Sequence, residues 1–201
     1  MRLAKVAVFL LSLVPAGWLT WGAFNDKLGA NPIEYITRDT GDWTLRFLLT
    51  TLAVTPLRKI LRKPDLIRFR RMLGLCAFFY GCLHLLTYVW LDKFFEFGEM
   101  VMDVAKRPFI TAGAVAFLTM LPLAFTSTSG WIRRLGGKRW QMLHRLIYVS
   151  AAAGVIHYYW LVKSDIRMPV LYGAILGLLL VYRLGARLAR PEKRPVAALQ
   201  R

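Results

Sequence analysis

The chain has 201 residues, 57% of them hydrophobic, and a mean hydropathy of +0.44, which excludes an ordinary water-soluble domain. Its 28 lysines and arginines give a net charge of +17, but they lie between apolar stretches and are not interleaved with stacking aromatic residues. That distribution argues against a nucleic-acid partner. Basic connections between apolar helices are typical of an integral membrane protein in contact with lipid.

Six stretches are long and apolar enough to cross the hydrocarbon layer as helices, which takes about 20 residues each. In chain order they are roughly 4 to 24, 43 to 61, 72 to 91, 108 to 126, 142 to 162 and 168 to 187. The first begins like a secretory signal, with Arg2 and Lys5 before an apolar run, but the run continues to Phe24 without a convincing cleavage site. We therefore expect an uncleaved first helix and a bundle of six transmembrane helices.

The connections between these stretches are short. The longest, at about 26 to 42, 92 to 107 and 127 to 141, cannot fold alone, so we expect residues 1–201 to form one all-α membrane domain. Most of the lysines and arginines lie in alternate connections, on the side that includes the N-terminus, and most of the acidic residues lie on the other side. Because cytoplasmic loops are enriched in Lys and Arg, both termini are predicted to be cytoplasmic.

Few ionisable residues lie inside the predicted spans, and such residues are functional candidates because burying them in lipid is costly. They are His84, His144, His157 and Arg46. His84 and His157 have similar heights in the outer half of the bilayer. His144 comes thirteen residues before His157 and lies about 20 Å nearer the cytoplasm. Each histidine alone could equally be an interhelical hydrogen-bond partner.

Two histidines at one level on facing helices suit the axial positions of a b-type heme. Small residues precede both of them at helical spacing and predict a slot for the flat macrocycle. They are Gly74, Ala77 and Gly81 before His84, and Ser150, Ala153 and Gly154 before His157. The alternative is that these small residues only let helices pack closely. No C-x-x-C-H motif is present, so a covalently attached heme is not expected.

His144 is a candidate ligand for a second heme, but two features complicate that role. Thirteen residues of straight helix rotate by about 220°, so His144 and His157 share a face only if the helix bends, for instance between Ser150 and Gly154. The position opposite His144 on the third predicted helix holds Arg70 and Arg71, which are not iron ligands. These arginines could instead pair with heme propionates or lipid phosphates, so an inner heme would be five-coordinate, unusually ligated or absent.

Arg46, near the outer end of the second predicted helix, has two possible roles. Its side chain could extend to the lipid headgroups, or it could pair with a propionate of the outer heme.

Several segments resemble the MsrQ (YedZ) family, the heme-carrying membrane subunits of bacterial methionine sulfoxide reductase systems. These segments are RFRRMLGL at 68–75, CLHLLTYVW at 82–90, LAFTSTSGWIRRLGGKRWQMLHRLIYV at 123–149 and VIHYYW at 155–160. The resemblance extends more distantly to the ferric reductase and NADPH oxidase membrane domain. Members of that wider group carry two histidines on each of two helices and bind two hemes. This sequence matches three of those four positions, with His84, His144 and His157, so the resemblance implies one heme b and possibly a second.

The resemblance also implies a location and partners. Electrons would cross the bacterial inner membrane outward, to a periplasmic molybdopterin subunit that reduces methionine sulfoxide in oxidised proteins. Since the sequence has no dinucleotide-binding motif, the donor would be a membrane quinol or a separate cytoplasmic flavin reductase. Family members are also associated with FMN, but no flavin site is recognisable here. The basic segment 58–71 could dock an acidic donor, although the charge bias of cytoplasmic loops explains it equally well.

Other functions are a ferric reductase or another transmembrane cytochrome b, a small non-heme transporter, and a structural anchor. A transporter would need more polar groups inside the membrane, broken helices or an inverted repeat, and these features are not evident. An anchor would leave the histidine pattern without a purpose.

Overall fold

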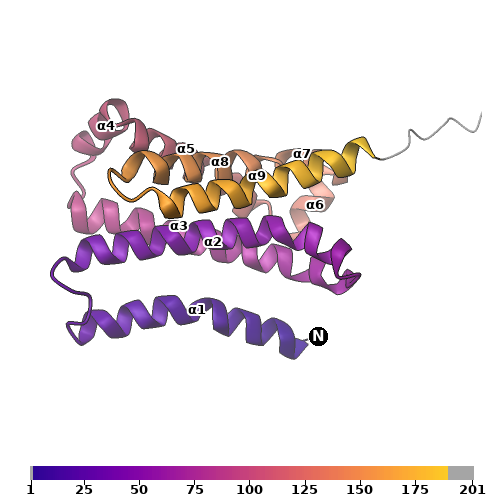
Figure 1. Cartoon of the computed structure of the whole chain (residues 1–201), viewed down its shortest axis with the longest axis horizontal. Coiled ribbons are helices and arrows are strands. Elements are labelled where there is room, and N and C mark those ends of the chain that lie inside the picture. The colour runs from indigo at the N-terminus through magenta and orange to yellow at the C-terminus, as the bar shows by residue number, and fades with distance from the viewer. Residues whose placement is uncertain (1, 190–201) are drawn as a thin grey trace, which may run out of the picture.

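The computed structural model describes residues 2–189, and every element in that range is helical, as the sequence predicts (Figure 1). The helices are α1 (Arg2–Phe24), α2 (Pro32–Ile60), η1 (Pro64–Phe69), α3 (Arg70–Leu86), η2 (Thr87–Asp92), α4 (Phe97–Lys106), α5 (Pro108–Phe125), α6 (Ser129–Leu135), α7 (Gly137–Leu143), α8 (Leu146–Leu161) and α9 (Arg167–Leu188). Four segments are long and apolar enough to span a membrane: Arg2–Phe24, Pro64–Asp92, Pro108–Phe125 and Arg167–Leu188. The count of six spans therefore stays a prediction.

Helix α2 is longer than the predicted span at 43 to 61, because it begins at Pro32. The side chain of Asn31 accepts a hydrogen bond from the backbone N–H of Glu34, and proline at the first helical position suits a helix start. The ion pair between Glu34 and Arg38 at 2.6 Å supports the first turns. Its 29 residues rise about 44 Å, more than the roughly 30 Å of hydrocarbon, so the charged N-terminal part can lie outside the apolar layer.

The predicted continuous helix at 142 to 162 is wrong. Helix α7 ends at Leu143, and α8 starts at Leu146. Between them the backbone N–H of Arg145 bonds to Met142 and that of Tyr148 bonds to Arg145, which are tight three-residue steps. The chain therefore turns at His144 itself and not between Ser150 and Gly154, and His144 does not lie on the helix that carries His157.

Four helices form the centre of the bundle. Helix α2 packs on α3 and α5 packs on α8, while contacts of α3 with α5 and of α2 with α8 close the square. Helices α3 and α8 thus lie on one diagonal, and α2 and α5 on the other. Leu52, Ala77, Tyr80 and Ala151 are fully buried in this core. Helix α9 packs against α8 and α2, and α1 lies apart from the square beside α2 (Figure 1).

Helix α1 is attached through a side chain inserted into its backbone ladder. The hydroxyl of Tyr80, on α3, donates to the carbonyl of Ser12 at 2.7 Å and accepts from the N–H of Ala16 at 3.1 Å. Ser12 and Ala16 are four residues apart, so the hydroxyl bridges a pair that would bond directly in a regular helix. Pro15 lies in the same turn, and together these features explain the bend of α1 seen in Figure 1.

The connections alternate between the two ends of the bundle. Helix α4 lies at one end, whereas α6, α7 and the N-terminus lie at the other (Figure 1). The connections predicted at 92 to 107 and 127 to 141 thus contain short helices. Asp103 secures α4 through Lys93 at 2.8 Å, Arg107 at 3.2 Å and the hydroxyl of Tyr88 at 3.0 Å. Which end faces the cytoplasm stays a prediction from the charge bias.

Candidate functional site

The structure brings His84 and His157 together across the bundle. His84 lies near the C-terminal end of α3, and His157 lies near the C-terminal end of α8. Their ring centres are 6.0 Å apart, and the ring planes make an angle of 78°. Both helices run toward the end of the bundle that carries α4, so the pair is near that end (Figure 1).

A backbone carbonyl from the opposite diagonal holds each ring. Nδ1 of His84 bonds to the carbonyl of Thr37 on α2 at 2.8 Å, and Nδ1 of His157 bonds to the carbonyl of Phe109 on α5 at 2.6 Å. Because a carbonyl only accepts, each Nδ1 must carry the proton and donate. Each Nε2 is left with a free lone pair, which is the state of a histidine that binds a metal.

A glycine also lies directly against each histidine ring. A Cβ atom at Gly41 would lie 3.1 Å from Nδ1 and Cε1 of His84, and a Cβ atom at Gly113 would lie 2.9 Å from Nδ1 of His157. Each glycine comes four residues after the carbonyl that holds the same ring. We call each pairing of a carbonyl with a glycine a seat: Thr37 and Gly41 for His84, and Phe109 and Gly113 for His157. In each seat a side chain in place of the glycine would press on the ring.

Sequence reasoning missed both seats. Thr37 and Gly41 fall in the predicted connection at 26 to 42, where no helical face was expected. Gly113 lies inside the predicted span at 108 to 126 but shows no polar side chain. The available signal was a glycine four residues after an unremarkable residue, repeated on two helices, and such a pattern is too common in membrane helices to stand out.

The geometry of the pair fits the axial positions of a heme. A coordinating imidazole nitrogen is about 2.0 Å from the metal and about 1.1 Å from its ring centre, so two axial rings have centres about 6 Å apart. Within residues 2–189, no group of three or more His, Cys, Asp and Glu side chains could hold a metal ion unaided. Iron between these two rings would need its remaining ligands from a macrocycle.

The small residues near the pair lie in helix contacts. A Cβ atom at Gly81 would meet Met120 of α5 at 2.9 Å, and one at Gly154 would meet Leu45 of α2 at 3.5 Å. Ser150 is fully buried, and its hydroxyl bonds to the carbonyl of Ala116 on α5 at 2.9 Å. These residues therefore bring the helices close together, as the packing alternative predicts. The fit to a heme rests on the histidines and their seats.

His144 has different surroundings. Its Nε2 lies 3.0 Å from the hydroxyl of Thr126, and its ring stacks on Trp140 at 3.9 Å between centres. The indole N–H of Trp140 in turn donates to the carbonyl of Thr126 at 2.8 Å. No backbone carbonyl holds Nδ1 within the described chain, and Nε2 already has a partner. The structure therefore does not orient His144 for a ligand in the way that it orients the pair.

The predicted arginines separate. Arg70 is half-buried at the start of α3, within electrostatic range of His144, Arg183 and Tyr148. Arg71 is exposed, and its side chain forms no salt bridge or hydrogen bond within residues 2–189.

Arg46 is partly buried, with its side chain 39% exposed, and it contacts other side chains of the bundle. Its Nε donates to the hydroxyl of Tyr172 at 2.9 Å, and its Nη2 lies 3.5 Å from a carboxylate oxygen of Asp42. Its guanidinium also lies over the ring of Trp43, 4.8 Å from the ring centre. Arg46 therefore has protein partners and does not simply extend to the headgroups.

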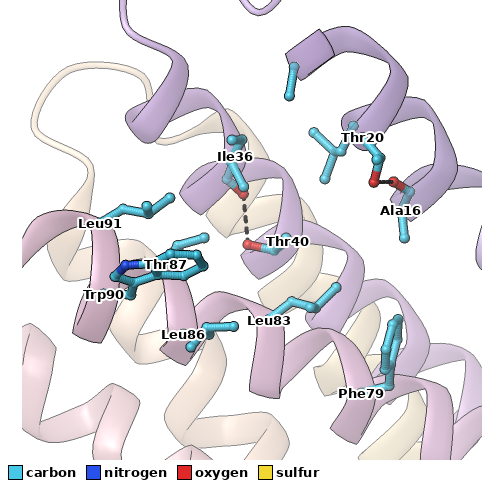
Figure 2. A pocket seen from close by; sticks show the side chains of 12 residues that line it. Ala16, Thr20, Ile36, Thr40, Phe79, Leu83, Leu86, Thr87, Trp90 and Leu91 are labelled. Atoms are coloured by element: carbon cyan, nitrogen blue, oxygen red, sulfur yellow. Dashed lines mark hydrogen bonds between the residues drawn. The ribbon is translucent and has the colours of Figure 1, made fainter.

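A groove of about 390 Å³ lies on the other side of α3, between α1 and the α2–α3 pair (Figure 2). Figure 2 shows Leu83, Thr87 and Trp90 of α3 and η2 facing Ile36 and Thr40 of α2. Neither histidine of the pair lines it. The hydroxyl of Thr87 donates to the carbonyl of His84 at 2.7 Å, which connects the groove wall to the backbone of the pair.

Comparison with known proteins supplies the family. Residues 40–155 match the model of the ferric reductase like transmembrane component. A protein of Herminiimonas arsenicoxydans named protein-methionine-sulfoxide reductase heme-binding subunit MsrQ is 55% identical over 185 residues, which cover 91% of this chain and 85% of that relative. The chain belongs to the MsrQ family. This finding confirms the resemblance seen in the sequence.

Other MsrQ relatives agree. One from Azospira oryzae is 56% identical and covers 92% of this chain and 79% of its own length. Another from Polaromonas naphthalenivorans is 48% identical and covers 95% of this chain and 88% of its own length. No solved structure matches the chain. The ferric reductase match includes all of α3 and α5, most of α2 and α8, and both His84 and His144. It ends two residues before His157.

Proposed function

We propose that this chain is the heme-binding membrane subunit of a methionine sulfoxide reductase system and passes electrons across the membrane to a catalytic subunit. The names of the MsrQ relatives support this function. The observation that carries it is the His84–His157 pair, with ring centres 6.0 Å apart and both Nδ1 atoms bonded to backbone carbonyls.

The residues of the pair have distinct tasks. The carbonyls of Thr37 and Phe109 fix the tautomer and increase the basicity of each imidazole. Gly41 and Gly113 let the rings lie against the backbone of α2 and α5. Both Nε2 atoms would hold a heme b, and the heme would supply single-electron transfer. Because all four helices are packed in one core, the ligands would move little when the charge changes.

The position of the pair supports a direction for the electrons. His84 and His157 lie toward the end of the bundle with α4, while the strongly basic connections lie at the other end. With the basic end in the cytoplasm of a bacterial inner membrane, the pair is on the periplasmic side. A periplasmic molybdopterin subunit would receive the electrons there and reduce methionine sulfoxide in oxidised proteins.

The donor would act at the opposite end or from within the membrane. A quinol or a cytoplasmic flavin reductase would supply the electrons, with FMN as a possible carrier by family resemblance. A second heme at His144 would shorten the path from that side. Such a heme requires the His144 side chain to leave Thr126, because Nε2 points to that hydroxyl.

The test is the spectrum and the donor dependence of the purified full chain. We expect a Soret band and an α band that dithionite sharpens, with reduction by either a short-chain quinol or NADH plus flavin reductase and FMN. Electron delivery is then measured with the purified catalytic subunit and a methionine sulfoxide peptide. A colourless protein from heme-replete cells would contradict the proposal.

The match to the ferric reductase like transmembrane component favours one alternative, a ferric reductase or another transmembrane cytochrome b. This alternative predicts that the reduced chain transfers electrons to ferric citrate faster than to the catalytic subunit. Comparing the two acceptors by stopped-flow reoxidation separates the two functions.

A further inference from the structure

The end of the bundle near His144 contains two half-buried arginines that have no acidic partner. Arg70 begins α3, and Arg183 lies in the last turns of α9. The salt bridges formed within residues 2–189 involve neither of them. Arginines such as Arg71 and Arg187, on the same two helices, are exposed and need no partner.

Arg183 is fixed inside the protein. Its Nη2 donates to the carbonyl of Leu52 on α2 at 2.6 Å, and its Nη1 donates to the hydroxyl of Tyr148 on α8. The Leu52 carbonyl is available because the residue four positions later is Pro56, which has no N–H. The guanidinium therefore joins three helices and does not extend to the solvent.

Two buried polar atoms beside this contact have no hydrogen-bond partner. They are Nε of Arg183 and the hydroxyl oxygen of Thr55. Thr55 comes three residues after Leu52, so its side chain lies on the face of α2 that Arg183 contacts. Buried polar atoms are nearly always paired in folded proteins, and two unpaired ones at the same contact indicate a missing partner.

The charges nearby indicate what kind of partner is missing. Arg70 is within electrostatic range of Arg183, Tyr148 and His144. Two half-buried guanidinium groups within electrostatic range repel, and an anion near both would offset that repulsion. The hydroxyl of Tyr148 accepts from Arg183, so its own hydrogen is free to donate.

We propose that Arg70, Arg183, Thr55 and Tyr148 form a binding site for an oxyanion, that is, a carboxylate or phosphate group. The group belongs to a heme propionate, a flavin phosphate or an anionic phospholipid. The site does not depend on the proposed function, because a lipid phosphate would fill it even if no heme were bound near His144.

Matched probes that differ only in the oxyanion test the site on the full chain in detergent. The pairs are ferric heme and its dimethyl ester, FMN and riboflavin, and phosphatidylglycerol and phosphatidylcholine. The variants are Arg70→Gln and Arg183→Gln, and the control is Arg187→Gln, an exposed arginine on the same helix as Arg183. Affinity is measured by absorbance, flavin fluorescence quenching and native mass spectrometry respectively.

We expect each site variant to bind the charged member of one pair about tenfold more weakly or worse, with the neutral member unaffected. The pair that responds identifies the source of the oxyanion. Unchanged binding of all three charged probes in both site variants would overturn the proposal, and so would an equal loss in the Arg187→Gln control.

Folding is checked by circular dichroism melting, because Arg183 also joins α2, α8 and α9. The side chain of Arg70 forms no hydrogen bond within residues 2–189, so Arg70→Gln should not disturb folding. If Arg183→Gln does not fold, Arg70→Gln alone tests the site. A colourless protein whose Arg70→Gln variant still loses phosphatidylglycerol binding would refute the heme proposal and support the oxyanion site.

Discussion

The two histidine neighbourhoods, at opposite ends of the bundle, are constructed differently. In the His84–His157 pair, backbone carbonyls and glycines of α2 and α5 fix both rings and leave Nε2 free. His144 is instead held by a side-chain hydroxyl and an indole, close to the positive charge of Arg70. The first neighbourhood holds two histidines ready to bind a metal through Nε2. The second neighbourhood places the positive charge of Arg70 beside a histidine that already has a partner. The two ends are thus suited to different chemical tasks, even though a histidine marks both.

The largest expected effect separates the two neighbourhoods directly. We predict that His84→Ala or His157→Ala abolishes the main heme absorbance, because one axial ligand is lost and the facing ring lies alone. His144→Ala should retain that signal and remove only a second, lower-potential component if one exists. Heme per chain is measured by pyridine hemochrome, together with a redox titration. A full reduced spectrum in His84→Ala would refute the pairing.

The glycine seats give the next effect. In Gly41→Ala and Gly113→Ala the new methyl group meets the histidine ring at 3.1 Å or 2.9 Å, so the ring must rotate or shift and its Nδ1 bond weakens. We expect a shifted heme midpoint potential and a loss of about 1–3 kcal/mol in stability. Redox titration and thermal melting measure both.

Gly177→Ala on α9 is the matched control. Nothing lies within 4 Å of its added Cβ atom, so we expect a stabilisation of about 0.5–1 kcal/mol from helix propensity and no change in potential. If the seat variants behaved like this control, the glycines would not position the rings.

A smaller effect is expected at His144. Thr126→Val removes the hydroxyl that pairs with Nε2 and should cost about 0.5–1.5 kcal/mol in stability. The spectrum of the His84–His157 pair should not change. Since the bond to Thr126 competes with iron for Nε2, the content of any second heme should stay the same or rise. A second heme that disappears in Thr126→Val would show that this hydroxyl supports ligation.

The smallest effect concerns α4. This helix immediately precedes α5, whose Phe109 carbonyl holds the ring of His157. The hydrogen bond from Lys93 keeps the pKa of the Asp103 carboxyl below its usual value, and the same contact raises the pKa of Lys93. A lowered carboxyl pKa stabilises the fold above the usual value near 4 and is lost as the pH falls through the lowered one. We therefore expect lower protection factors for the amides of α4 at acidic pH, that is, faster exchange relative to the intrinsic rate at the same pH.

Asp103→Asn removes this acid dependence and should exchange faster at neutral pH as well. Because α4 is connected to α5 through the single residue Arg107 and also packs against it, loosening of α4 should reach His157 as a small shift of the Soret band. Protection factors in α4 that do not change between neutral and acidic pH would contradict this role of Asp103.

Several features could be predicted from the sequence. The helical membrane fold follows from apolar stretches long enough to span, and His84 and His157 could be paired by counting residues from charged boundaries. The break at His144 could not be predicted, because the local sequence contains neither proline nor glycine between 141 and 149. Arg183 was not a candidate either. At the end of a predicted span it resembles every other basic residue, and its role depends on the carbonyl that Pro56 frees on a different helix.

The sequence by itself determined that the chain is a helical membrane protein with three histidines at two levels, since hydrophobic length and charge distribution are local properties. Only the tertiary structure decided which atoms face those histidines. A backbone carbonyl and a glycine show no chemical character in a sequence, and they become part of a site only when packing of α2 and α5 places them against the rings of the other diagonal. The same holds for Arg183, whose lack of an acidic partner becomes evident only when its guanidinium joins α2, α8 and α9.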